Sequence, residues 1–181
     1  MEQDFSELEH FCLCVGLDDS NHGGTNAGEG IVASFSFFYE DSIVKNYGKG
    51  KDEFMVLNWL NKGGNKRDVR YCILKADRFR RSSQNLAYAA PYLVNDFLRT
   101  CHPDMKSLKM YLDGSMTNES KENLRKEFEP KVKSFVVDNF PKKERVHYCP
   151  FVVYASHVIS NRICRGDEAF IQYSKQVDVP E

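Results

Sequence analysis

Two short apolar runs in this chain end in aspartates, which limits how the chain can fold. Residues 11–17 (Phe-Cys-Leu-Cys-Val-Gly-Leu) lead into Asp18 and Asp19. Residues 108–112 (Leu-Lys-Met-Tyr-Leu) lead into Asp113. Turn residues follow each run, which indicates a β-strand that stops at a loop. If the two strands are neighbours in a sheet, three carboxylates converge at their ends.

Such a cluster predicts a metal site, although each run also has a simpler interpretation. Clustered carboxylates repel one another and lose hydration, so a divalent cation is the natural way to hold them together. Taken singly, Asp113-Gly114 and the run 18–21 (Asp-Asp-Ser-Asn) are also sequences that commonly form turns. The metal-site hypothesis therefore depends on both runs occurring in one chain.

The order of the expected elements predicts an α/β fold. Three extended segments open the chain and form an antiparallel meander, at residues 11–17, 30–39 and 42–47. Strands and helices then alternate, which predicts a mixed sheet flanked by helices. These later elements are a helix at 52–61, a strand at 69–74, a helix at 82–100 containing Pro91, the strand before Asp113, a charged helix at 119–131, a strand at 134–138 and a helix from 150 to 164.

Composition restricts the class of protein. The 181 residues predict a single domain, residues 1–181, with a core at about 11–165 and a short tail at 166–181. Lys and Arg number 25 against 26 Asp and Glu, so no overall positive field attracts nucleic acid. The six cysteines include no CxxC pair, which favours reduced, buried thiols. With no apolar run of membrane-spanning length and an acidic N-terminus, we expect a cytoplasmic protein without a membrane partner.

The motifs and their order resemble type 2 ribonuclease H, also called ribonuclease HII, a member of the ribonuclease H-like fold. That family opens with a strand ending Asp-Glu-Ala-Gly-Arg-Gly, where this chain has residues 18–23 (Asp-Asp-Ser-Asn-His-Gly). Its central strand ends in Asp-Gly, like Asp113-Gly114 here. An Ala-Ser-rich helix follows, like residues 155–160, and an Asn-containing helix start precedes the Asp-Gly strand, like residues 83–87. The resemblance spans about residues 11–165.

The resemblance implies a five-stranded mixed sheet, an antiparallel meander followed by parallel strands, flanked by helices. It also implies a divalent-metal-dependent endonuclease that hydrolyses phosphodiester bonds, chiefly RNA in RNA·DNA hybrids or ribonucleotide-containing duplexes. The expected metal ligands are Asp18, Asp19 and Asp113. Oxygen ligands of this kind suit Mg²⁺ or Mn²⁺, which activate water and stabilise a leaving oxygen.

The chain departs from the family pattern in the fourth ligand of the metal site. The Ala-Ser helix of the family carries a Lys and ends in Arg-Asp, where this chain has Ser160 and Ile163-Cys164. Two residues are candidates for the vacant catalytic role. Asp167 lies three residues beyond Cys164, and His157 lies on the helix itself. An ordinary helical histidine, hydrogen-bonded locally, is the alternative interpretation of His157.

Substrate contacts are expected from two loops and from the Ala-Ser helix. The family's Gly-Arg-Gly segment reads the ribose, and Asn21, His22 and Gly23 occupy that place here. Basic residues before the long helix can track phosphates, or can simply be solvated loop charges. The expected substrate-binding residues are Asn21, His22, Gly23, Arg78, Arg80, Arg81, Ser156 and Asn161.

Two other functions remain open at the level of the sequence. One is a ribonuclease H-fold protein that has lost catalysis and binds nucleic acid or has a structural role. The other is a nuclease of the same fold that acts on DNA. The three retained aspartates favour an enzyme, because burying carboxylates without a metal costs stability.

Overall fold

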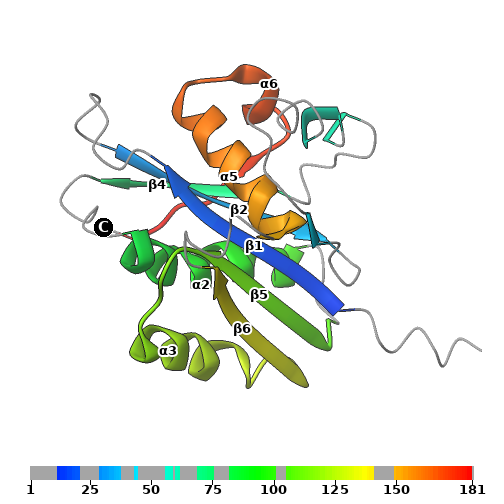
Figure 1. Cartoon of the computed structure of the whole chain (residues 1–181), viewed down its shortest axis with the longest axis vertical. Helices are drawn as coiled ribbons and strands as arrows, with labels where there is room; N and C mark the ends of the chain where they lie inside the picture. Colours follow the sequence, from blue (N-terminus) through cyan, green and yellow to red (C-terminus); the bar gives the residue numbers. More distant parts are fainter. Residues whose placement is uncertain are drawn as a thin grey trace, which may run out of the picture.

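The computed structural model describes most of the sheet and its helices. The described residues are 12–20, 29–37, 43–44, 56–58, 60–61, 69–75, 82–100, 105–140 and 149–180. They form an α/β fold, in agreement with the predicted class (Figure 1). In chain order its elements are β1 (Cys12–Ser20), β2 (Glu29–Phe37), β3 (Ile43–Val44), β4 (Val69–Lys75), α2 (Ser82–Thr100), β5 (Ser107–Asp113), α3 (Asn118–Phe128), β6 (Ser134–Phe140), β7 (Cys149–Pro150), α5 (Phe151–Cys164), α6 (Glu168–Ile171) and β8 (Lys175–Gln176).

The main sheet has six strands in the order β6-β5-β1-β2-β4-β8. β1 pairs antiparallel with β2 and parallel with β5. β2 pairs antiparallel with β4, while β6 and β8 add in parallel to β5 and β4. The central position of β1 follows from its composition, since a strand buried on both faces needs a nearly continuous apolar run.

The predicted five-stranded sheet with an opening meander is wrong in two respects. The expected third strand, residues 42–47, contributes only β3 to the described structure, and β3 pairs with β7 in a separate two-stranded sheet. The main sheet instead gains β8 at one edge, from the segment that was expected to be a short tail. A two-residue strand such as β8 is too short to leave a periodic signal in the sequence.

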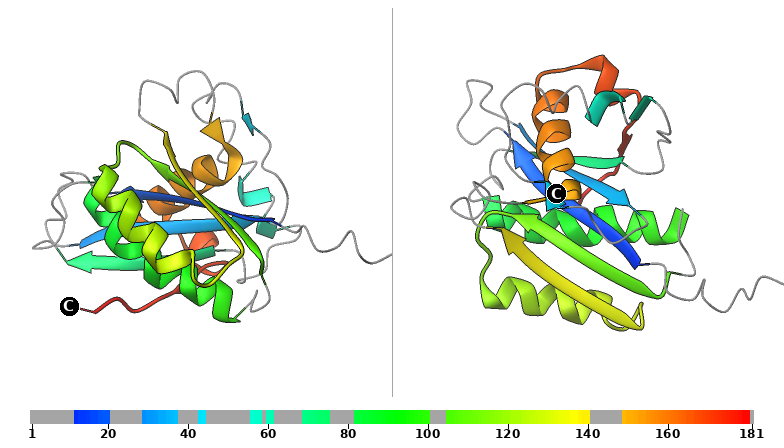
Figure 2. Two further views of the ribbon diagram at one scale, coloured as in Figure 1. Left: turned by 90° about the horizontal axis from the view of Figure 1, so that it is seen from below. Right: turned by 45° about the vertical axis from the view of Figure 1, so that its right-hand side comes forward.

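Helices cover the two faces of the sheet, as the views in Figure 2 show. Odd-numbered residues of β1, such as Leu13 and Val15, pack in one apolar cluster with α2. Cys14, by contrast, lies in a second cluster with α5. Side chains of a strand alternate between faces, so each layer of the core receives every second residue of β1. Among the described helices, none has both the length and the apolar character to cross a membrane.

The helix boundaries largely agree with the sequence analysis. The prediction of a helix at 82–100 is confirmed by α2, which contains Pro91. α3 begins after the N-cap Thr117, whose side chain accepts a hydrogen bond from the Ser120 amide, and it ends at Phe128 rather than at residue 131. Of the helix expected at 52–61, residues 56–58 and 60–61 are described and helical.

α5 ends next to a glycine whose backbone lies in the left-handed region. Gly166 has φ of +74°, and its amide donates to Ile163 while the Asp167 amide donates to Arg162. These two bonds form a Schellman motif, which satisfies the last carbonyls of the helix. The helix therefore stops at Cys164 and does not continue to Asp167.

Gly16 lets α5 lie directly on β1. A Cβ atom at Gly16 would be 2.1 Å from the carbonyl oxygen of Val152. The Ser156 hydroxyl is 2.8 Å from the carbonyl oxygen of Gly16 and 2.8 Å from that of Val152, and it can donate to either. Ala155 and Ser160 are fully buried on the same helix. The small residues of α5 thus serve close packing, and this packing sets the height of the whole helix above β1.

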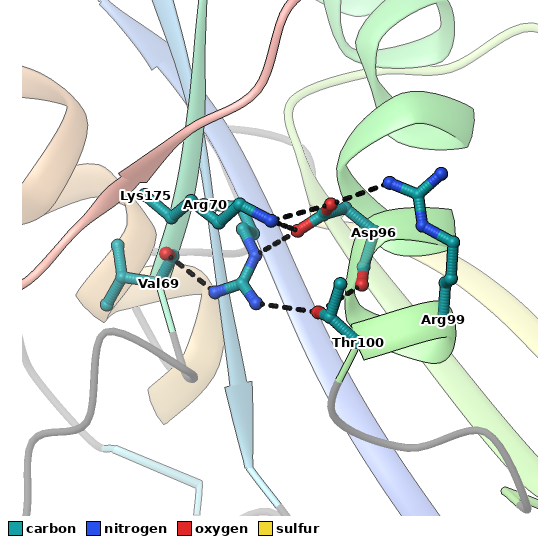
Figure 3. A network of polar contacts seen from close by, with 6 residues as sticks. All are labelled: Val69, Arg70, Asp96, Arg99, Thr100 and Lys175. Carbon is teal, nitrogen blue, oxygen red and sulfur yellow. Dashed lines mark hydrogen bonds and ion pairs between the residues drawn. The ribbon is translucent and has the colours of Figure 1, made fainter.

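A buried ion pair joins α2 to the edge of the sheet. The Arg70 Nε atom of β4 lies 2.5 Å from Oδ2 of Asp96 on α2, and both side chains are buried (Figure 3). Lys175 of β8 lies 2.9 Å from each carboxylate oxygen, and the exposed Arg99 donates to Oδ1 at 3.1 Å. The Arg70 guanidinium also lies over the ring of Phe97, 4.6 Å from its centroid.

We expect the Gly16→Ala variant to lose stability because its Cβ would displace the Val152 backbone. Overpacking of this kind costs about 3 kcal/mol when the neighbour is backbone. Gly166→Ala is the matched control, because no atom lies within 4 Å of its added Cβ and only its φ is unfavourable. That control should cost about 1 kcal/mol. Urea unfolding measures both, and a loss at Gly16 no larger than at Gly166 would contradict the proposed contact.

We expect Asp96→Asn to cost about 3–5 kcal/mol, because it leaves Arg70 buried without its carboxylate. Burial alone would raise the pKa of Asp96, but hydrogen bonds from Lys175 and Arg70, together with their charges, hold this pKa below its ordinary value of 3.8. A carboxylate with a lowered folded-state pKa contributes its stability above the unfolded-state pKa and loses it as the pH falls through the folded-state value.

Unfolding of the wild type and of Asp96→Asn at a series of pH values tests this expectation. Their difference in unfolding free energy should be constant at neutral pH and shrink in acid, below the ordinary value of 3.8. Arg99→Ala is the matched control, since that side chain is 78% exposed and its loss should cost less than about 1 kcal/mol. A difference that does not change with pH would rule out Asp96 as the titrating group.

Candidate functional site

Asp18 and Asp113 lie at the carboxyl ends of two neighbouring parallel strands. The pairing of β1 with β5 runs to Leu17 opposite Leu112, so the next position of each strand is an aspartate. Leu17 and Leu112 both belong to the apolar cluster on the α2 face. By alternation, Asp18 and Asp113 both face the α5 side, and both are buried. The structure thus brings these two predicted residues together.

His157 of α5 contacts Asp18. Its Nδ1 atom is 2.7 Å from Oδ2 of Asp18, and the other carboxylate oxygen accepts a 2.8 Å hydrogen bond from the Asp19 amide. The Asp18 side chain is 2% exposed, whereas that of His157 is 49% exposed. An ionised carboxylate is only an acceptor, so this contact requires a proton on Nδ1. Asp18 therefore orients an imidazole that lies at the surface.

Further hydrogen bonds fix His157 on its helix and the helix on the strand. The Asn161 amide donates to the His157 carbonyl at 2.8 Å, and its nitrogen lies 3.4 Å from the ring Nδ1. Ser20, at the end of β1, donates to the carbonyl of Ser160 at 3.0 Å. Predicted Asn161 thus lies beside His157, as expected for residues four apart on a helix.

Asp19 faces the opposite side of the sheet from Asp18. Its Oδ2 atom accepts a 3.2 Å hydrogen bond from the side-chain amide of Asn85 in the first turns of α2, and both residues are buried. A negative charge near the start of a helix is favourable, because the helix dipole is positive there. The described contact between Asp19 and Asn85 therefore attaches α2 to β1, on the face of the sheet opposite to Asp18.

The turn after Asp113 is held by the neighbouring strand β6. Gly114 has φ of +80°, a value that favours glycine. Its amide donates to the Phe140 carbonyl at 2.9 Å, and its own carbonyl accepts from the Asn139 side chain at 2.9 Å. Two residues of β6 thereby fix the backbone that follows Asp113.

The other predicted catalytic and substrate residues have clear structural roles or lie outside the described part. Asp167 lies beyond the end of α5, where it caps α6 by accepting a hydrogen bond from the Ala169 amide. It also pairs with Arg162. Ser156 is fully buried against β1. The structure brings neither to Asp18 and Asp113. Asn21, His22, Gly23, Arg78, Arg80 and Arg81 lie outside the described residues.

Asp18 and Asp113 are the two carboxylates that the described residues place at these strand ends on one face. Among the residues that the structure describes, no group of three or more His, Cys, Asp or Glu side chains is placed to hold a metal ion. Asp18 and Asp113 supply carboxylate oxygens, the donors that Mg²⁺ and Mn²⁺ prefer. Because Mg²⁺ keeps several water ligands, two protein carboxylates are a sufficient protein contribution.

Sequence reasoning did not assign site roles to Asn85 and Asn139. Asn85 belongs to the helix-start motif at residues 83–87. Its position near the predicted N-terminus of the helix was the sequence feature that could have indicated a site role. Asn139 gave no local signal, because its partner Gly114 lies 25 residues away in the chain. Such a pair is found only once β5 and β6 are known to be neighbours.

We expect the His157 ring to carry its proton on Nδ1 in the neutral state, because the Asp18 carboxylate can only accept. Long-range ¹⁵N–¹H correlation spectra of the histidines report the tautomer directly. In the Asp18→Asn variant the preference should weaken, since an amide can donate as well as accept. Asn161→Ala is the comparison variant, as it leaves the carboxylate in place. An unchanged tautomer in Asp18→Asn would contradict the assigned contact.

Comparison with known proteins gives this chain no family. A scan against protein-family models and a search of curated proteins each found no match. The arrangement of Asp18, Asp113 and His157 is therefore the evidence on which a function can be based.

Proposed function

We propose that this protein is a divalent-metal-dependent endonuclease that hydrolyses phosphodiester bonds, with RNA in RNA·DNA hybrids or ribonucleotide-containing duplexes as the favoured substrate. The observation that carries the proposal is the position of Asp18 and Asp113. Both carboxylates are buried at adjacent strand ends on one face, and His157 contacts the first of them. In open α/β sheets, the carboxyl ends of parallel strands are the usual location of ligand sites.

The arrangement of the strands also supports a ribonuclease H-like fold. β1 lies at the centre with an antiparallel neighbour, β2, on one side and a parallel neighbour, β5, on the other. β6 then extends the parallel half, and α5 crosses the face of β1. The Asp-Gly motif and the Ala-Ser helix of the resembled family occupy β5 and α5 in this arrangement.

Each residue of the site has a defined task in the proposed reaction. Asp18 and Asp113 would hold the cation, with water and phosphate oxygens completing its coordination. When bound there, Mg²⁺ or Mn²⁺ would polarise the phosphate and activate a water molecule. His157, oriented by Asp18 and half exposed, can hydrogen-bond a phosphate oxygen or the attacking water. Asn139 would hold the turn after Asp113 and thereby fix the direction of its carboxylate.

Burial of the two aspartates favours this function over a simple turn. A buried carboxylate loses its hydration, which partners within the protein or a bound cation must compensate. A turn-forming aspartate, by contrast, is normally exposed to solvent. Asp18 is 1% exposed and Asp113 is 8% exposed, so each occupies a position that a turn alone does not require.

One observation favours a second candidate function, a ribonuclease H-fold protein that binds nucleic acid without cutting it. His157 and the Asp19 amide already bond both oxygens of Asp18, and Asp19 is directed to Asn85 on the other face. In this alternative, Asp18 serves to fasten α5 to β1 through His157. A nuclease of the same fold that cuts DNA remains the third possibility, and the same substrate panel tests it.

Cleavage of end-labelled substrates tests the proposal. The panel contains an RNA·DNA hybrid, a DNA duplex with a single ribonucleotide and a plain DNA duplex, each with Mg²⁺ or Mn²⁺. We expect ribonucleotide-containing strands to be cut, and Asp113→Asn to lower the rate by at least the roughly 10–100-fold that loss of an outer-shell partner of a metal ligand costs. Asp178→Asn is the matched control because this aspartate lies beyond β8, and it should cut at the wild-type rate.

The outcomes separate the candidate functions. Cutting of the plain duplex that Asp113→Asn loses would assign the DNA nuclease. Absence of cutting by the folded wild type, together with retained binding of a labelled hybrid, would assign the non-catalytic role. Cutting that persists in Asp113→Asn would show that Asp113 is not a ligand. Asp19→Asn adds a further distinction, since we expect it to reduce stability more than the cleavage rate.

A further inference from the structure

The C-terminal segment Ser174–Pro180, here called the strap, lies along the outer edge of β4. Lys175 and Gln176 pair in parallel with Arg70 and Tyr71. The amide of Val177 continues this pairing by donating to the Tyr71 carbonyl at 2.8 Å. The strap is thus bound as an extended strand added to the edge of a sheet, the mode by which many proteins bind peptides.

Alternate side chains of the strap contact the α2 side of the sheet. Lys175 bonds both oxygens of Asp96, and the partly buried Val177 and Val179 pack against the apolar cluster that includes α2. This gives a Lys-x-Val-x-Val pattern on one side of the strap. Main-chain pairing supplies affinity in such complexes, and the alternate side chains supply selectivity.

Contacts on the other side and at the end of the strap complete its attachment. The Tyr71 hydroxyl lies 3.2 Å from Oε1 of Gln176. Burial raises the pKa of Tyr71, so the hydroxyl remains protonated and donates. The hydroxyl of Tyr88 on α2 donates to the carbonyl of Pro180 at 2.6 Å. These bonds recognise the backbone carbonyl of Pro180 and the side chain of Gln176.

The strap can leave without leaving an uncompensated buried charge. Asp96 keeps its buried partner Arg70, because that pair does not involve the strap (Figure 3). The Lys175 side chain is 44% exposed and returns to water at little cost. β8 is only two residues long, and its neighbouring valines are only partly buried. Segments with few buried contacts open at a lower free energy than the core does.

We propose that the surface formed by the edge of β4 and by α2 is a peptide-binding site, and that the strap is its detachable intramolecular ligand. The ligand that this surface fits is an extended peptide with the pattern Lys-x-Val-x-Val. Asp96 recognises the lysine, the apolar cluster receives the valines, and Tyr88 holds a backbone carbonyl near the end. This assignment is independent of the nuclease proposal, because the site lies on the other side of the sheet, at its far edge.

Hydrogen exchange on the full-length protein tests whether the strap opens by itself. We expect the Val177 amide to exchange at least about 100-fold faster than the β1 amides, because it is released by local opening. Lys175→Ala should accelerate exchange at Val177 about fivefold and leave β1 unchanged. Arg99→Ala is the matched control, since it removes a different cation from Asp96. Exchange of Val177 at the rate of β1 would overturn the proposal.

Binding of a peptide in trans tests the site itself. A fluorescent peptide of residues 174–181 is titrated into full-length Val177→Asp, whose own strap carries a charge where the apolar cluster needs a valine. We expect saturable binding to this variant and at least about tenfold weaker binding to the wild type, whose site is occupied. A Lys175→Ala version of the peptide should bind about fivefold more weakly.

The results for peptide binding decide the assignment. Equal binding of both peptides, or no binding to folded Val177→Asp, would overturn the proposed site. If Val177→Asp does not fold, the exchange measurement on the wild type decides alone, because it needs no variant. Faster exchange at the Val177 amide than at the β1 amides would then support the detachable strap.

Discussion

The close contact between β1 and α5 is the constraint on which the rest of the molecule depends. Gly16 removes the side chain that would keep the helix away, and Ser156 hydrogen-bonds across the contact. With the helix at this height, His157 reaches the carboxylate of Asp18. A side chain at position 16 would collide with the Val152 backbone and hold α5 farther from the strand. Small residues on both elements are therefore what makes a polar contact possible there.

Much of this fold could be predicted because the signals are local. The 3.6-residue periodicity of residues 82–100 is strong enough to define α2 to the residue. The strands that hold Asp18 and Asp113 are likewise visible as apolar runs that stop at turn residues. The sequence did not indicate which strands pair with one another. β3 was assigned to the main sheet because it follows β2 in sequence, but it pairs with β7, more than a hundred residues later.

The candidate site shows the same division between local and distant information. Asp18 and Asp113 were predicted as neighbours, and the register of β1 and β5 agrees. Asp19 was grouped with them because it is adjacent in sequence, yet adjacent residues of a strand face opposite sides of a sheet. Asn85 is the partner of Asp19, and Asn139 is the partner of Gly114. In each pair the two residues lie on different elements, and no local sequence pattern connects them. The alternation of side chains along a strand was therefore the available argument for Asp19. The partners Asn85 and Asn139 could not be predicted, because each lies far in sequence from the residue that it contacts.

The attachment of Gly114 to β6 has a mechanical consequence. Asn139 and Phe140 hold both polar groups of the Gly114 peptide backbone, so the end of β5 moves with the end of β6. β6 is one of the two edge strands of the main sheet. A displacement of this outer strand would thus move the Gly114 turn and the backbone next to the Asp113 carboxylate.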